Sequence, residues 1–93
     1  QFRLHYSPGI PLKMNVKKIK KDAAFILIKK RKIKLDNHYY LTTNGNLKEA
    51  AKNLYTILRR IKNEGYKSIA VEKIPNTGLG KTINDRLNRA SKF

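Results

Sequence analysis

A glycine-rich stretch near the carboxyl terminus has residue types that could hold phosphate. Gly78-Leu79-Gly80-Lys81-Thr82 is expected to open a helix, and a helix amino terminus can bind phosphate through its free N–H groups. A P-loop needs four residues between its glycines, whereas this stretch has one, and the third glycine of a dinucleotide fingerprint is absent. The spacing therefore favours a tight loop that packs the last helix against a sheet. A small nucleotide-binding domain that uses residues 78–81 is the alternative.

The histidines and carboxylates give little basis for a metal site or for catalysis. His5 and His38 stand in a chain without cysteine, which makes a poor metal site. The acids are scattered, and no two have the spacing of an acid and a base paired on one helix face. They are Asp22, Asp36, Glu49, Glu64, Glu72 and Asp85. We therefore expect this chain alone to be non-catalytic, with no metal and no cofactor of its own.

The net charge of +16 suggests a polyanionic partner such as RNA. Ten of the 22 residues from 13 to 34 are Lys or Arg, and Tyr39 and Tyr40 follow and could stack on bases. The candidate phosphate contacts are Lys13, Lys17, Lys18, Lys30, Arg31 and Lys32. Two other interpretations stay open: the lysines form a solvated face while the tyrosines pack in a sheet, or AT-rich codons inflate Lys. The second is suggested by 16 Lys against 6 Arg, with 10 Ile and 9 Asn, because binding sites favour Arg.

The elements that must position these residues form one domain preceded by a linker. Residues 1–11 are expected to be extended, because Pro8 and Pro11 remove backbone donors and restrict the residues before them. Residues 12–93 are expected to form one α/β domain. The apolar patterns predict strands at 12–16, 23–28, 39–42 and 68–74, with the 23–28 strand buried on both faces. We expect a small three-layer, Rossmann-like α/β sandwich with a mainly parallel sheet, because a helix joins the last two strands.

Two helices complete the predicted domain. Asn46 can cap the first, with Glu49 completing a variant of the capping box, and Gly65 supplies a left-handed stop. The second begins near Leu79 or Gly80. Their predicted buried stripes are Leu47, Ala51, Leu54, Leu58 and Ile61, and then Ile83, Leu87 and Ala90.

The composition also indicates the cellular compartment in which the protein is found. The absence of cysteine excludes disulfides and fits a reducing cytoplasm, so we expect a cytoplasmic protein. The longest apolar run, residues 23–28, is far too short to span a bilayer, so we expect no membrane partner. The chain starts with Gln1 instead of Met, which suggests a piece of a longer protein.

Four motifs, in order along nearly the whole chain, resemble a known family. His5-Tyr6-Ser7-Pro8 resembles the His-Tyr-Ala-Pro motif of the interdomain linker in long threonylcarbamoyl-AMP synthases, with Ser7 replacing the commoner Ala. The stretch Asn46-Leu47-Lys48-Glu49-Ala50-Ala51-Lys52-Asn53-Leu54-Tyr55 is similar to the family's long helix. Ile69-Ala70-Val71 with Ile74-Pro75 resembles its next strand. Gly78-Leu79-Gly80, followed by Ile83-Asn84-Asp85-Arg86-Leu87-Asn88-Arg89-Ala90, resembles its terminal helix, and this last motif is the most specific.

The resemblance implies that the chain is the carboxy-terminal accessory domain of a nucleotidyltransferase. Such an enzyme makes threonylcarbamoyl-AMP from threonine, bicarbonate and ATP with a divalent cation, for threonylcarbamoyladenosine formation in tRNA. Its catalysis lies in an amino-terminal YrdC-like domain, which the resemblance makes the expected partner, in cis or as a separate chain. The family linker crosses the active-site mouth, so His5, Tyr6 and Pro8 are carried over as ligand-proximal residues. The hypothesis is that this domain anchors a lid; a basic module that binds tRNA or ribosomal RNA is the alternative.

Overall fold

A parallel sheet carries both helices of the domain on one face. The computed structural model describes residues 10–17, 22–32 and 35–90. Along the chain these form β1 (Leu12–Lys13), β2 (Ala23–Lys29), β3 (His38–Thr42), α1 (Leu47–Asn63), β4 (Ser68–Val71) and α2 (Leu79–Ala90). The four strands form one sheet in the order β1-β4-β2-β3, and every neighbouring pair is parallel. The predicted α/β sandwich with a parallel sheet is therefore confirmed.

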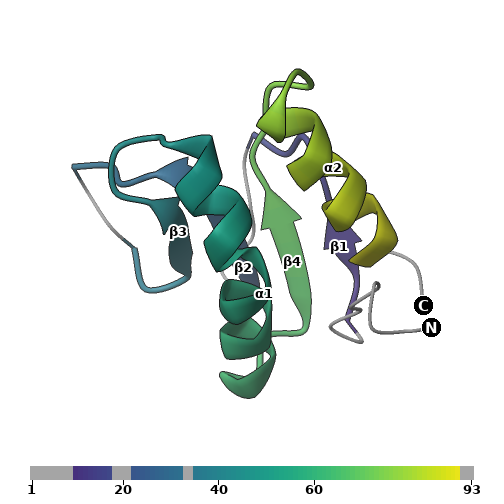
Figure 1. Cartoon of the computed structure of the whole chain (residues 1–93). Helices are drawn as coiled ribbons and strands as arrows, with labels where there is room; N and C mark the ends of the chain where they lie inside the picture. The colour runs from purple at the N-terminus through teal and green to yellow at the C-terminus, as the bar shows by residue number, and fades with distance from the viewer. Residues whose placement is uncertain (1–9, 18–21, 33–34, 91–93) are drawn as a thin grey trace.

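The layers are unequal. Figure 1 shows α1 and α2 side by side on the same face, with α1 over β2 and β3 and α2 over β4 and β1. Fifteen buried residues form the core between this helix layer and the sheet. The opposite, rear face carries a smaller buried cluster of Phe25, Leu27 and Ala70. The described part of the chain thus supplies a sheet with one helix layer. The third layer that we expected is not found in this part, where the smaller cluster lies on the rear face instead.

The central strand β2 shows why a continuous apolar run predicts burial on both faces. Ala24 and Ile26 point into the main core, whereas Phe25 and Leu27 belong to the rear cluster. All residues from Ala23 to Leu27 are buried. Because β2 lies between β4 and β3, its backbone is hydrogen-bonded on both sides. The run therefore has no solvent-facing side, as is usual for parallel strands.

Helix α1 begins and ends where its local sequence predicts. The side chain of Asn46 accepts hydrogen bonds from the N–H groups of Lys48 (2.9 Å) and Glu49 (3.3 Å). The reciprocal half of the capping box is wrong, because Glu49 accepts from the Thr43 N–H at 3.4 Å instead. Gly65, with φ of 87°, follows the last turn. The buried stripe is Ala50, Leu54, Leu58 and Ile61, while the predicted members Leu47 and Ala51 are only partly buried.

Two strands are shorter than predicted, β1 because of a local turn and β4 because of a side-chain contact with a distant segment. β1 stops at Lys13, and Asn15, with φ of 61°, then turns the chain, although the Val16 N–H still donates to the Val71 carbonyl. β4 stops at Val71, short of the predicted end at Ile74. The Glu72 carboxylate accepts the Ile28 N–H at 2.6 Å, so that this side chain takes the place of the next strand carbonyl.

Candidate functional site

The point where the chain enters the domain is fixed to the edge of the sheet. The Pro11 carbonyl accepts the Ile69 N–H at 2.8 Å, and Leu12 then pairs in register with Ile69. Leu12 is buried, and Ile10 packs against the main core. Pro11 and Leu12 are therefore held to β4 by backbone pairing, and Ile10 and Leu12 are held by apolar packing. The carried-over residues His5, Tyr6 and Pro8 lie outside the described residues.

The glycine-rich stretch packs α2 tightly against the preceding loop. A Cβ atom on Gly80 would lie 1.9 Å from the Pro75 carbonyl oxygen, a contact that only glycine avoids. The Gly80 N–H donates to the Thr77 carbonyl at 2.9 Å, and the Lys81 N–H donates to the Gly78 carbonyl at 3.2 Å. Two donors of this helix start thus have backbone partners, which agrees with the packing loop and gives a phosphate little to bind.

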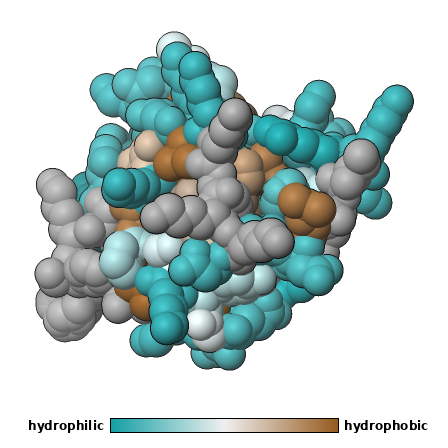
Figure 2. Space-filling model, turned by 180° about the vertical axis from the view of Figure 1, so that it is seen from behind, coloured by the Kyte–Doolittle hydropathy of each residue, from teal (hydrophilic) through white to brown (hydrophobic). Residues whose placement is uncertain are grey.

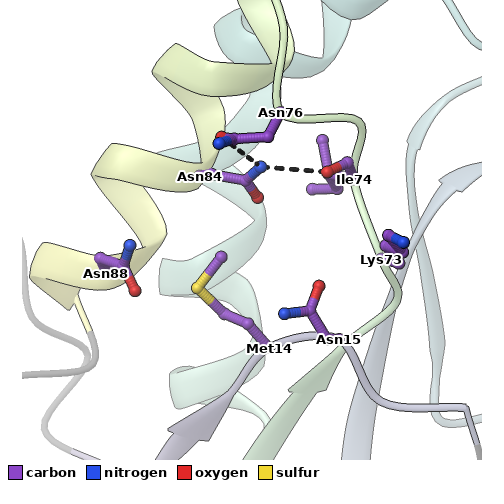
Figure 3. A pocket seen from close by; sticks show the side chains of 7 residues that line it. All are labelled: Met14, Asn15, Lys73, Ile74, Asn76, Asn84 and Asn88. Atoms are coloured by element: carbon purple, nitrogen blue, oxygen red, sulfur yellow. Dashed lines mark hydrogen bonds between the residues drawn. The ribbon is translucent and has the colours of Figure 1, made fainter.

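A polar pocket lies at the carboxyl ends of β1 and β4, beside α2. Its volume is about 340 Å³. The lining residues are Met14, Asn15, Lys73, Ile74, Asn76, Asn84 and Asn88. Figure 3 shows Asn84 reaching from α2 to the loop after β4, where its amide donates to the Ile74 carbonyl (3.0 Å) and to Asn76 Oδ1 (3.3 Å). Crevices at the carboxyl ends of parallel strands are common ligand sites, and amides beside a lysine suit a small polar molecule.

Sequence reasoning missed this pocket. Its asparagines come from three separate segments, at residues 15, 76 and 84–88, and only Asn84 and Asn88 belong to a motif that drew attention. The pocket lies at the opposite end of the sheet from Ile10, since β1 starts beside Ile10 and ends just before Met14. The entry point and the pocket are therefore two separate features of the domain.

A comparison with protein-family models decides the family. The model described as "Threonylcarbamoyl-AMP synthase, C-terminal domain" matches residues 1–92. This chain belongs to that family. Neither the search of curated proteins nor that of solved structures found a match. Membership connects the chain with threonylcarbamoyl-AMP synthase, and so with tRNA modification, and implies a YrdC-like catalytic domain as its partner.

Two of the motifs that resembled the threonylcarbamoyl-AMP synthase family, the long helix and the terminal helix, have structural roles in this C-terminal domain. Asn46 caps α1, and the Asn53 side chain donates to the Leu41 carbonyl at 2.9 Å, which fixes α1 to β3. Asn84 ties α2 to the loop after β4, and Gly80 lets that loop approach the helix. These residues fix the position of the helices on the sheet through hydrogen bonds and close packing.

The candidate phosphate contacts of the C-terminal domain lie on β1 and in the segments that follow β1 and β2. Lys13 lies on β1 at one edge of the sheet, and Lys30, Arg31 and Lys32 follow β2, with β4 between the two strands. Arg31 forms a 3.0 Å ion pair with Glu72, which ties it to the end of β4. The remaining candidates are Lys17, which is exposed, and Lys18, which lies outside the described residues. Their contact with phosphate stays a prediction.

The two tyrosines pack within the C-terminal domain. Tyr39 is 4% exposed, and its hydroxyl donates to Glu64 at the end of α1. The Arg60 guanidinium lies 5.4 Å from the centroid of its ring. Burial first, and then the Glu64 hydrogen bond, raise the pKa of Tyr39 above its usual value. Tyr40 packs in the rear cluster, edge-on to His38 at 6.4 Å, so the packing interpretation is the one that the structure favours.

Among residues 10–17, 22–32 and 35–90, no three His, Cys, Asp or Glu side chains gather into a group that could hold a metal ion. Within the same described residues, neither helix is long and apolar enough to cross a membrane.

Proposed function

We propose that this domain anchors the segment of residues 1–11 so that the segment can close over the active site of a YrdC-like catalytic domain. The observation that carries the proposal is the fixed entry point, where the Ile69 N–H binds the Pro11 carbonyl and Leu12 is buried in the sheet. Ile10 and Pro11 therefore have little freedom. The lid residues would thus be attached to a rigid part of the domain.

The length of chain between the support and the lid residues is short. Four residue steps separate Tyr6 from Ile10, which at full extension span at most about 14 Å. His5 and Tyr6 must therefore remain close to the domain. A tether this short confines the lid to a small volume and lowers the entropic cost of closing it.

Closure would serve the chemistry implied for the parent enzyme. That enzyme forms a carbamoyl adenylate from threonine, bicarbonate and ATP with a divalent cation, and releases pyrophosphate. Water can hydrolyse this adenylate. A lid that excludes water protects such an intermediate. The role of this domain is then to position, in a cytoplasmic enzyme, residues that act on a site located in another domain.

The test compares three forms of the two-domain enzyme. Deletion of residues 12–93 should lower the yield of threonylcarbamoyl-AMP per ATP consumed by tenfold or more, because the lid loses its support. Insertion of four glycines between Gly9 and Ile10 should give a smaller loss, because the domain remains but the tether slackens. The same insertion between Thr43 and Asn44, in the loop after β3 at the opposite edge of the sheet from β1, is the matched control and should leave the yield unchanged. If the deletion leaves turnover and yield intact, the anchoring role is wrong.

A further inference from the structure

The arginines of the described domain are distributed unevenly between its surfaces. Arg31 and Arg60 form ion pairs with Glu72 and Glu64. The other arginines within the described residues are Arg59, Arg86 and Arg89, and none of them pairs with a carboxylate there. All three belong to α1 or α2. AT-rich codons would inflate Lys, Ile and Asn, so a codon bias does not account for this clustering of arginine.

Helix geometry places these arginines on the outer sides of α1 and α2 and on the flanks where the two helices adjoin. Asn53 turns towards β3, where it binds the Leu41 carbonyl. At about 100° per residue, Lys62 lies about 180° around the axis from Asn53, on the flank next to α2, and Arg59 lies between that flank and the outer side of α1. Figure 1 shows α2 beside α1 on the side away from β3.

The same reasoning applies to α2. Asn84 and Asn88 turn to the pocket beside β1. Arg86 lies about 160° around the axis from each of them, and Arg89 follows one turn later. These arginines therefore lie on the flank and outer side towards α1. Arg86 is half-buried and Arg89 is exposed.

Together these side chains form a basic surface on the outside of the helix layer. The inter-helix surface consists of Lys52, Arg59 and Lys62 from α1 with Arg86 and Arg89 from α2. On α1, the row from Lys52 to Lys62 is about 15 Å long at 1.5 Å per residue. One acid, Asp85, stands beside it, whereas Glu49 accepts the Thr43 N–H and Glu64 pairs with Arg60. A row of cations of this length suits the regular negative charge of a nucleic-acid backbone.

We propose that the inter-helix surface binds the phosphate backbone of RNA, with tRNA as the partner. Arginine suits this role because its planar fork can hold two phosphate oxygens at once. The inter-helix surface is distinct from the segment of residues 13–34. That segment has a higher density of positive charge along the chain, but its Arg31 is paired with Glu72. It is also separate from the entry point at Pro11, so the proposal is independent of lid anchoring.

The experiment measures binding of the 93-residue chain to a fluorescein-labelled, unmodified tRNA transcript by anisotropy between 50 and 200 mM salt. Five phosphate contacts predict a slope of log affinity against log salt of about −4, which is roughly two orders of magnitude across this range. Arg59→Gln, Arg86→Gln and Arg89→Gln combined should weaken binding tenfold or more and make the slope shallower by about 2 to 3.

The matched control removes the same number of positive charges from residues 13–34. Lys13→Gln, Lys17→Gln and Lys30→Gln combined should weaken binding less than threefold. Asp85→Asn should tighten binding about twofold, because it removes the acid beside the surface. Circular dichroism melts should show that each variant remains folded, and the Asp85 variant gives a gain that unfolding cannot produce.

Three results would overturn the proposal. Equal losses in the two triple variants would mean that binding follows net charge alone. A larger loss in the lysine variant would move the contact to residues 13–34. If the arginine variant loses binding to the catalytic domain while its tRNA affinity is unchanged, the inter-helix surface is a protein interface.

Discussion

The two faces of the sheet bury very different amounts of apolar side chain. The helix-covered face holds fifteen buried residues, to which both helices and all four strands contribute. On the rear face the described residues give three, Phe25, Leu27 and Ala70, with Val16 and Tyr40 partly buried against them. Figure 2 shows the rear face, where apolar groups gather in the middle and hydrophilic side chains surround them. The difference indicates that the helix-covered face supplies most of the stability and rigidity, on which the entry strand β1 depends.

The largest expected effect comes from truncating one buried leucine on each face of the sheet. Leu58 and Leu27 are both fully buried, in the main core and in the rear cluster. Leu58→Ala should lower the free energy of unfolding by about 4 kcal/mol, because close-packed neighbours from helices and strands cannot collapse into the cavity. Leu27→Ala should cost about 2 kcal/mol, because the thinner layer can relax. Urea unfolding measures both, and equal losses would remove the distinction between the faces.

The next effect concerns the contact of α2 with the loop after β4. Gly80→Ala places a Cβ against the Pro75 carbonyl and should destabilise the domain by about 3 kcal/mol, because backbone must move. Gly65→Ala is the control: it meets no atom within 4 Å but has φ of 87°, so it should cost about 1 kcal/mol. A Gly80→Ala variant as stable as the wild type would show that α2 is not seated against Pro75.

A smaller effect is expected where β4 leaves the sheet. Glu72→Ala removes the acceptor of the Ile28 N–H and should cost about 1–2 kcal/mol, because that donor loses its partner. Arg31→Ala breaks only the ion pair, in which the arginine side chain is 53% exposed, and should cost under about 0.5 kcal/mol. Hydrogen exchange should become faster at Ile28 in the Glu72 variant alone. Similar exchange rates in both variants would mean that the ion pair holds this edge.

The smallest expected change in stability depends on pH and comes from Tyr39, on the helix-covered face of the sheet. Tyr39→Phe should cost about 1 kcal/mol near neutral pH, because the hydrogen bond to Glu64 is lost. The pKa of Tyr39 is raised in the folded state, so its contribution is complete below the unfolded value near ~10 and is lost as the pH rises above it. The stability difference between wild type and variant should therefore shrink above pH 10. A difference that grows there would mean that Tyr39 ionises more readily when folded.

The elements that could be predicted from sequence are those with local causes. Asn46 and Gly65 set the ends of α1 through contacts within a few residues, and the run of residues 23–28 identified β2. The end of β1 could not be predicted, because the alternating pattern of residues 12–16 does not show the positive φ of Asn15. The end of β4 could not be predicted either, because a contact between distant segments lies there. The Glu72 carboxylate binds an N–H 44 residues away in the chain, which no local pattern shows.

The candidate sites divide in the same way. The role of Gly80 as a packing glycine followed from its spacing, because that spacing fits neither phosphate motif. The pocket and the inter-helix surface could not be predicted, because each combines residues from separate segments. The density of charge along the chain indicated residues 13–34, whereas the arginines of the inter-helix surface come from two helices that pack side by side.

The central claim is that this domain holds a lid for a catalytic domain, and calorimetric titration of the 93-residue chain into the separately expressed YrdC-like domain tests it most directly. At physiological salt, we expect saturable binding that tightens when ATP and threonine are present and weakens at least tenfold with Tyr6→Ala. The Tyr55→Ala variant, altered on α1, is the control and should bind as the wild type does. Absence of binding, or binding that ignores both the ligands and Tyr6, would contradict the account.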